Sequence, residues 1–448
     1  MSEIPRAAVV LRPGDRGHDA ELAGFQTGFP VRPELVVGAA DAGEVAAAVA
    51  HAAARGLPVA VQATGHGLAG AIEGGVLITT RRMDGVRIDP VARTARIGAG
   101  VSWARVVAAA APYGLAPLNG SSPGVGVVSY LLGGGLGLLA REYGYAADHV
   151  RSFGLVTADG RSRRVTAVDE PELFWALRGG GPGLGVVTEV ETVLVPVARL
   201  YGGSLLFDCS GSGAGTRADE VVAAYLEWTR GLPDTLTSGV SVMVFPDLPM
   251  VPEFLRGRYT VSVRVAYTGT AAEGERLVAP LRALGPVLAD TLREMPYTDS
   301  ASIHSDPEQP HAYYGDSAMI RTPDAGTVRE LLAATGPAAP VMCVVQLNHL
   351  GGALAKEPDV PGAVPHREAE FLVRVLSPLA GTDRAALRAL YGPVLGALAP
   401  LTVGRSRNFS FGDGARAEGL HGAGTADRLA GLRSQYDPAN LFGRGLGV

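Results

Sequence analysis

The tetrapeptide Thr64-Gly65-His66-Gly67 directly follows the apolar run Pro58–Ala63. Glycines at the end of a strand let the backbone approach a ligand closely, and their N–H groups can bind a pyrophosphate. A histidine between two such glycines would be held beside that ligand. A tight turn with an incidental histidine explains the tetrapeptide equally well, so the motif alone leaves both interpretations open.

Three further glycine-rich stretches lie in the same half of the chain, at Gly120–Gly126, Gly133–Gly137 and Gly179–Gly185. One such stretch is ordinary, but four predict close backbone approach at several points along an extended ligand. None has the G-x-G-x-x-G spacing, because Leu138 and Val186 stand at the third glycine position. The pattern therefore favours a dinucleotide-sized ligand bound by an architecture other than the Rossmann fold.

The segment Gly120-Ser121-Ser122-Pro123-Gly124 also matches the nucleophile elbow of α/β-hydrolases. In those enzymes the backbone N–H of the residue after the serine stabilises the oxyanion, and Pro123 has no N–H. The preceding segment, Leu115–Asn119, contains a proline and is a poor strand. We therefore do not expect a serine hydrolase.

Composition argues against several other classes of protein. The 448 residues suggest two or three domains, and a net charge of −5 predicts no nucleic-acid partner. Lys356 is the only lysine and lies in a polar stretch, which argues against a P-loop and a Schiff base. The histidines lack metal-ligand spacing, so we expect no metal, and a solvated pair at His304 and His311. With no signal peptide and no apolar run of roughly 18 residues, a cytoplasmic protein without membrane contact is expected.

The elements that must position the glycine motifs alternate between strand and helix. Glu34–Val37 and Pro58–Ala63 are predicted strands. Between them, Asp41 and Glu44 have capping-box spacing for a helix that Gly56 ends. Further predicted elements of this half are strands at Val76–Thr79, Arg87–Asp89, Thr94–Ile97 and Val186–Val195, helices at Ser102–Gly114 and Pro171–Arg178, and a hairpin of Ser152–Thr157 with Arg161–Thr166.

The second half of the chain has a different pattern of predicted elements. Ser210–Gly215 reads as a flexible connection, and longer helices then alternate with strands. The predicted helices are Asp219–Arg230, Ala271–Leu284 and Ala325–Ala334, and the predicted strands are Ser238–Phe245, Tyr259–Tyr267 and Val341–Leu347. The tail, Thr402–Val448, is again rich in glycine and resembles the first half more than the second.

Six stretches in this order carry a resemblance to a known family. They are Gln62–Gly67, Gly120–Gly126, Leu132–Gly137, Arg141–Val150, Leu173–Gly181 and Tyr436–Phe442. Together they resemble the berberine-bridge-enzyme-like branch of the vanillyl-alcohol-oxidase/p-cresol-methylhydroxylase (PCMH) flavoproteins, and the resemblance covers nearly the whole chain. It implies an α+β fold with a PCMH-type FAD-binding domain of two subdomains over residues 1–198. A central α+β substrate domain with an antiparallel sheet would occupy residues 199–400, and residues 401–448 would return to the FAD domain.

The resemblance also implies roles for individual residues. His66 matches the histidine that carries the 8α-methyl group of the flavin, and Ser122 stands where many members have a second, cysteinyl link, so one covalent bond is expected. Val125 matches a valine of oxygen-reactive members. Further positions matched near the cofactor are Thr64, Gly65, Gly67, Gly120, Ser121, Gly126, Val187, Asn408 and Asn440.

The chain departs from the family where relatives often have a catalytic tyrosine. Ser406 and Phe409 occupy the two tyrosine positions, so the usual base is absent unless Tyr130, Tyr143 or Tyr297 replaces it. Ordinary packing explains each of these three tyrosines as well. From the central domain, the pocket-lining candidates are Gln346, Asn348, His349 and His366, although a structural salt bridge is an alternative for the dipeptide His366-Arg367.

These observations predict an FAD-dependent oxidase. A small organic substrate, such as a phenol, hydroquinone or amine that needs no strong deprotonation, would give a hydride to the flavin, and dioxygen would reoxidise it. Two alternatives remain open: a flavin-containing protein that binds and sequesters a drug, and a flavin-dependent oxygenase of a biosynthetic pathway.

Overall fold

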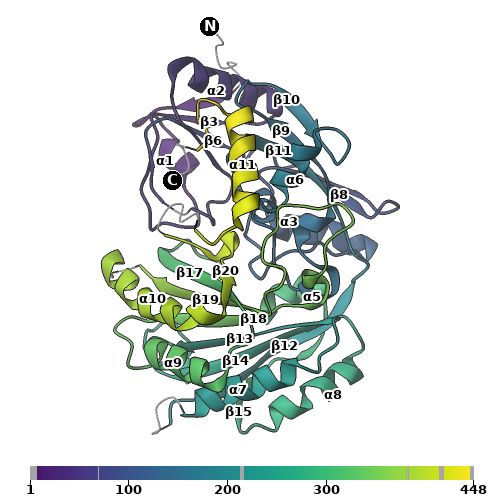
Figure 1. Cartoon of the computed structure of the whole chain (residues 1–448), viewed down its shortest axis with the longest axis vertical. Helices are drawn as coiled ribbons and strands as arrows, with labels where there is room; N and C mark the ends of the chain where they lie inside the picture. Colours follow the sequence, from purple (N-terminus) through teal and green to yellow (C-terminus); the bar gives the residue numbers. More distant parts are fainter. Residues whose placement is uncertain are drawn as a thin grey trace.

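The computed structural model describes residues 8–68, 70–211, 216–379, 381, 383–412 and 418–443. Figure 1 shows two lobes, one above the other, with the N-terminal half of the chain in the upper lobe. The predicted connection Ser210–Gly215 lies mostly outside the described residues, from Ser212 onward. The α+β fold class predicted from the sequence is confirmed by a mixture of helices with two antiparallel sheets and a smaller, mainly parallel one.

The first subdomain of the upper lobe is the predicted β-α-β unit. Its sheet has the order β1 (Val9–Leu11), β3 (Leu35–Gly38), β6 (Val76–Thr79) and β4 (Val59–Gln62), in which β3, β6 and β4 are parallel. The connecting helix α2 spans Ala42–Arg55. The Asp41 side chain accepts the backbone N–H of Glu44, and the Glu44 carboxylate accepts that of Ala40, so the predicted capping residues hold the start of the helix.

The second subdomain is an antiparallel sheet. Its strand order is β10 (Ser162–Val165), β9 (Val150–Val156), β11 (Val186–Val193), β8 (Thr94–Gly98) and β7 (Val86–Asp89). Short helices lie around it, namely α3 (Trp103–Ala110), α4 (Val127–Leu132), α5 (Ala140–Tyr143) and α6 (Pro171–Leu177). One hydrophobic core joins the two subdomains through buried residues such as Val37, Ile78, Ile97 and Leu155.

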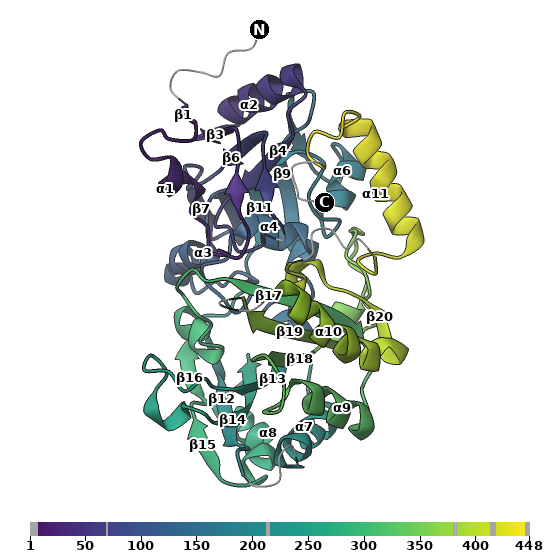
Figure 2. The same ribbon diagram turned by 90° about the vertical axis from the view of Figure 1, so that its left-hand side faces the viewer.

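The lower lobe contains a large antiparallel sheet, nine-stranded within the described part of the chain. Its order is β15 (Val287–Asp290), β12 (Arg199–Asp208), β14 (Tyr259–Tyr267), β13 (Leu236–Val244), β18 (Val344–His349), β19 (Phe371–Pro378), β17 (Tyr313–Ile320) and β20 (Thr402–Gly404), with β16 (Arg293–Pro296) also paired to β12. Helices α7 (Thr216–Thr229), α8 (Ala271–Arg282), α9 (Ala325–Thr335) and α10 (Arg384–Leu398) cover the face away from the upper lobe (Figures 1 and 2).

Alternation along these strands gives the sheet two different faces. On β14, Val261 and Val263 pack into the core beneath the helices, while Arg264 faces the other way. On β19, Val373 and Val375 likewise face the helices, and Arg374 the opposite side. The face turned toward the upper lobe is therefore polar around these two arginines, with apolar neighbours such as Leu372 and Leu376 on the same side.

The C-terminal segment returns to the upper lobe. Strand β20 extends the large sheet, and helix α11 (Ala423–Tyr436) then lies beside α6, where Arg428 pairs with Glu172 (Figures 1 and 2). Beyond α11, the carbonyl of Leu441 accepts the backbone N–H of Val59 at the start of β4. Among the described helices, none is long and apolar enough to cross a bilayer.

Candidate FAD site and substrate cavity

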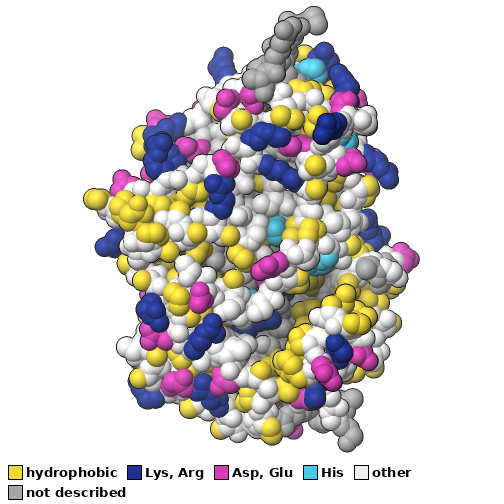
Figure 3. All heavy atoms as spheres, turned by 180° about the vertical axis from the view of Figure 1, so that it is seen from behind, with side chains coloured by type: hydrophobic (Ala, Val, Ile, Leu, Met, Phe, Trp, Pro, Cys, Tyr) yellow, Lys and Arg dark blue, Asp and Glu magenta, His cyan; other side chains and the backbone are white. Residues whose placement is uncertain are grey.

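A cavity of about 500 Å³ lies where the two lobes meet. Its walls come from the loop after β4, the glycine-rich loop before α4, the polar face of the large sheet and the segment after β20. Figure 3 shows the molecule from behind, with some histidine side chains exposed near mid-height and others near the top. Segments far apart in the chain thus share one cavity.

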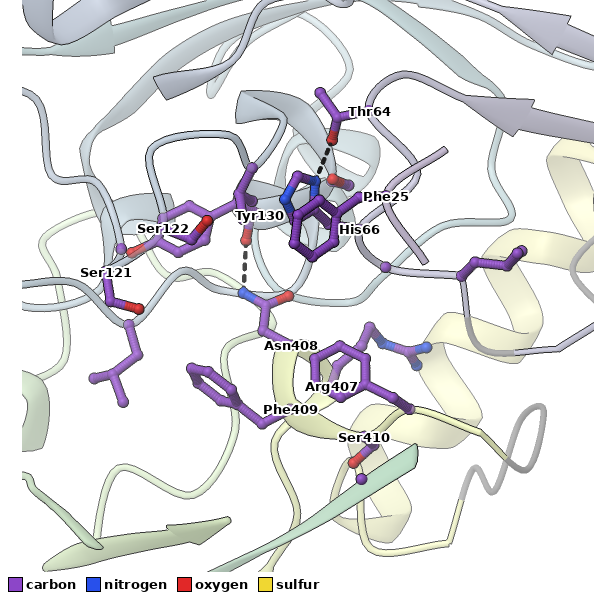
Figure 4. A pocket seen from close by; sticks show the side chains of 18 of the residues that line it. Phe25, Thr64, His66, Ser121, Ser122, Tyr130, Arg407, Asn408, Phe409 and Ser410 are labelled. Carbon is purple, nitrogen blue, oxygen red and sulfur yellow. Dashed lines mark hydrogen bonds between the residues drawn. The ribbon is translucent and has the colours of Figure 1, made fainter. Parts of the chain in front are cut away.

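His66 lies in the loop that follows β4. Its Nδ1 is 2.9 Å from the Thr64 hydroxyl, and its ring stacks on Phe25 with a centroid distance of 3.9 Å (Figure 4). The Nε2 atom is buried and has no hydrogen-bond partner among the described residues. Burial, and to a smaller extent the nearby His311, lowers the pKa of His66 to about 4, so the imidazole is neutral at pH 7.

Gly65 sets the path of the chain around this histidine. Its φ of +74° is in the left-handed region, and a Cβ there would lie 2.6 Å from the Cα of Gly24. The backbone N–H groups of Phe25 and Gln26 donate to the carbonyls of Thr64 and Gly65. A side chain at Gly65 would therefore push away the segment that carries Phe25.

The loop Gly120–Gly126 forms the wall next to His66. The backbone N–H of Gly126 donates to the Thr64 hydroxyl at 3.2 Å, and Gly120, Ser121, Ser122 and Val125 line the cavity. Figure 4 shows Ser121 and Ser122 on the cavity side of this loop.

The segment after β20 closes the cavity opposite His66. The Asn408 amide donates to the backbone carbonyl of Tyr130 at 2.9 Å, and Phe409 lies beside Asn408 (Figure 4). A Cβ at Gly133 would overlap the Asn408 side-chain oxygen, so only glycine leaves room for this contact. Ser406 instead lies beside a smaller neighbouring pocket.

Most of the predicted cofactor residues come together. Those on the cavity wall are Thr64, Gly65, His66, Gly67, Gly120, Ser121, Ser122, Val125, Val187 and Asn408. Gly126 lies just behind the wall and contacts it through Thr64. Asn440 is not on the wall; it has a φ of +50° in the turn that leads to Leu441.

The three candidate tyrosines are spread out. Tyr130 borders the cavity, but its hydroxyl faces the carbonyl of Leu118 at 3.3 Å, and burial raises its pKa. Tyr297 donates to the carbonyl of Pro117 and to the side chain of Asn119, away from the wall. Tyr143 is on α5, also off the wall, and burial raises its pKa to about 12.

Of the pocket-lining candidates predicted from the central domain, two lie on the cavity wall and two do not. Gln346 and Asn348 line the cavity. His349 instead stacks on Phe371 and contacts Arg141. His366 lies next to the carbonyl of Gly419, and its neighbour Arg367 forms a buried ion pair with Asp148, the structural alternative for that dipeptide.

Sequence reasoning missed a polar cluster on the large-sheet side of the cavity. Arg264 and Arg374 extend from the sheet, and His304 and Asp306 come from the loop after β16. His304 and His311 are both half-buried on the wall, and the predicted solvated pair is wrong for His304, whose Nδ1 is buried and has no hydrogen-bond partner among the described residues. The alternation in β14 marks Arg264 as facing away from its valine neighbours. Among the described residues no cluster of three metal-ligating side chains occurs.

Comparison with known proteins agrees with this geometry. Residues 33–166 match the FAD binding domain family. The (R)-6-hydroxynicotine oxidase of Paenarthrobacter nicotinovorans is 32% identical over 309 residues, which cover 66% of this chain and 63%, less than two thirds, of the relative. An FAD-linked oxidoreductase of Dictyostelium discoideum is 25% identical over 86% of this chain and 82% of its own length.

Solved structures extend the likeness to the whole fold. The 6-hydroxy-D-nicotine oxidase of Arthrobacter nicotinovorans superposes with a TM-score of 0.83 at 26% identity, covering 98% of this chain and 97% of that one. A carbohydrate oxidase of Microdochium nivale shares the fold, with a TM-score of 0.82 at 18% identity over 97% and 96% of the two chains. Residues 33–166 thus match an FAD binding domain, and the chain as a whole is similar in fold to FAD-linked oxidases. The resemblance seen in the sequence is thereby confirmed.

Proposed function

We propose that this protein is an oxidase that holds FAD through a covalent bond to His66 and acts on a small organic molecule. Bound FAD would supply the redox chemistry, which is hydride acceptance from the substrate and reoxidation by dioxygen. The protein residues bind and orient both molecules. The relatives named for oxidation of hydroxynicotine support this class of reaction.

The site fits FAD chemically. His66 offers a neutral imidazole with one nitrogen lacking a partner among the described residues, as a covalent attachment site requires. Thr64 orients that ring from the other nitrogen. Backbone groups of Gly65, Gly67 and the loop Gly120–Gly126 would hold the cofactor where they line the same wall.

One observation carries the proposal: His66 and the polar face of the large sheet border the same cavity. A flavin attached to His66 would therefore share its space with side chains of a different domain, which could select the substrate. The hydroxyls of Tyr143 and Tyr297 lie off this wall, and Tyr130 has a raised pKa. This supports a substrate that needs no strong base, such as a phenol, hydroquinone or amine.

Acid precipitation tests the cofactor and its attachment. We expect a yellow pellet, and a tryptic peptide of residues 56–81, which contains His66, heavier by one FAD. His66→Ala should give a colourless pellet, whereas His51→Ala, on the outer helix α2, should stay yellow. Colourless wild-type protein that takes up no FAD on reconstitution would contradict the proposal, and release of intact FAD would contradict the covalent bond.

Oxygen uptake tests the reaction itself. FAD-loaded protein is screened in an oxygen electrode with phenols, hydroquinones and amines, and hydrogen peroxide is measured in parallel. We expect uptake with stoichiometric peroxide for at least one class. Tight ligand binding without uptake would contradict the oxidase and favour drug sequestration.

A further inference from the structure

Two arginines reach the cavity from the polar face of the large sheet. Arg264 on β14 is level with Gly239 on β13, and Arg374 on β19 is level with Gln346 on β18. Strands β13 and β18 separate the two, and Gly239 has no side chain to fill the space beside Arg264. Both guanidinium groups are therefore available from one side of the cavity.

Their hydrogen-bonding capacity is largely unused. Arg374 donates through Nε to Gln346, and its guanidinium lies 4.9 Å from the ring centre of Phe409. The Arg264 guanidinium forms no hydrogen bond or ion pair with any residue that the structure describes. A guanidinium has five N–H donors, and leaving them unpaired in a desolvated place costs free energy.

Charge is also unbalanced in this part of the wall. Asp306 is the neighbouring carboxylate, and it accepts a hydrogen bond of 2.5 Å from Ser121. His304 is neutral, because burial and then Arg264 lower its pKa to about 3. Elsewhere on the wall, Asp316 pairs with Arg405 and does not offset the charge. Two arginines thus face one carboxylate.

We propose that the oxidised molecule carries an anionic group, such as a carboxylate, and that Arg264 and Arg374 bind it. Planar guanidinium groups match carboxylates in geometry and bind them by paired, charge-assisted hydrogen bonds. Arg374, packed against Phe409, is already oriented for this contact. The inference rests on the proposed function and adds the substrate class.

The test uses full-length, FAD-loaded protein and ligands in matched pairs. Acetate, benzoate and phenylacetate are compared with acetamide, benzamide and phenylacetamide by titration, following the flavin absorption spectrum. The variants are Arg264→Gln and Arg374→Gln. Arg329→Gln, on the outer face of α9 in the same lobe, is the matched control. Flavin content and circular dichroism are recorded for each protein first.

We expect at least one carboxylate to bind about tenfold or more tightly than its amide, the difference that one charged hydrogen bond supplies. Each cavity variant should remove most of that preference, with amide binding and flavin content unchanged, and Arg329→Gln should keep it. Equal binding of acids and amides across the panel would overturn the inference, as would a preference that survives both substitutions. Variants that lose FAD instead would place the arginines at the cofactor and overturn it too. Wild-type protein without FAD contradicts the proposed function, whereas loaded protein without a carboxylate preference contradicts this inference alone.

Discussion

The Thr64 hydroxyl lies between His66 Nδ1, at 2.9 Å, and the backbone N–H of Gly126, at 3.2 Å. It therefore fixes the imidazole ring of His66 against the loop Gly120–Gly126. The hydrogen bond at one ring nitrogen determines the state of the other nitrogen. The protonation and the orientation of Nε2 therefore depend on the side chain of Thr64, two residues earlier in the chain.

Thr64→Val should lower the fraction of FAD that is covalently bound. Valine has nearly the shape of threonine but cannot hydrogen-bond to the His66 ring, so the imidazole loses its fixed orientation. The measurement is the ratio of acid-stable to total flavin after expression. Thr64→Ser keeps a hydroxyl and should keep the bond, and full attachment in the valine variant would show that Thr64 has no orienting role.

Val125→Leu should slow reoxidation of the reduced flavin by dioxygen. Val125 lies on the cavity wall, so a larger side chain there would narrow the cavity. The rate is measured by stopped-flow mixing of photoreduced protein with air-saturated buffer, recording the return of flavin absorbance. Val125→Ala, which widens the same place, should react at least as fast as wild type. If leucine and alanine give the same rate, Val125 does not control oxygen access.

Gly133→Ala should reduce the free energy of unfolding by about 1–3 kcal/mol, the usual cost of overpacking. Gly133 has φ −89° and ψ 6°, which alanine tolerates, so the cost comes from the overlap with Asn408. Denaturant unfolding measures it. In the background of Asn408→Ala the same substitution should cost clearly less, because the overlapping group is gone. Additive effects would contradict this contact.

Stability should fall as the pH decreases from about 6.5 toward 4. Burial lowers the pKa of His421 to about 4 and that of His304 and His349 to about 3. The unfolded chain therefore binds more protons than the folded one in this range, so unfolding is favoured by acid. Each group contributes on the order of 1–2 kcal/mol after allowance for solvent screening.

Thermal unfolding at pH 7.5 and pH 5 measures this effect. His349→Gln, which removes a histidine that is not on the cavity wall, should reduce the difference in melting temperature between the two pH values. If the variant shows the same difference in melting temperature as the wild type, His349 is already protonated in the folded protein at pH 5.

The parts of the site that are local in sequence could be predicted. The strand ending at Gln62 leads directly into the loop that holds His66, and no distant contact is needed to recognise this. Asp41 and Glu44 likewise identify the start of α2 from neighbouring residues alone.

The large-sheet side of the cavity depends on contacts between distant segments and could not be predicted. Arg264 and Arg374 are 110 positions apart in numbering and reach one cavity because β13 and β18 lie between their strands. The sequence around His304 is typical of an exposed loop. In the structure this segment folds inward, and Asp306 accepts a hydrogen bond from Ser121 of the other lobe. Phe25 stacks on His66 because backbone hydrogen bonds hold its segment against the loop after β4. Hydrophobic periodicity does not predict this pairing.

The order in which the cavity walls occur along the chain constrains how the protein can acquire its cofactor during synthesis. Phe25 and His66 emerge early from the ribosome, but Asn408 and Phe442, which border the same cavity, emerge more than 300 residues later. A nascent chain that has folded its first sheet still presents an open, incomplete site. Enclosure of the flavin must therefore be among the last events of maturation, after translation has passed Phe442.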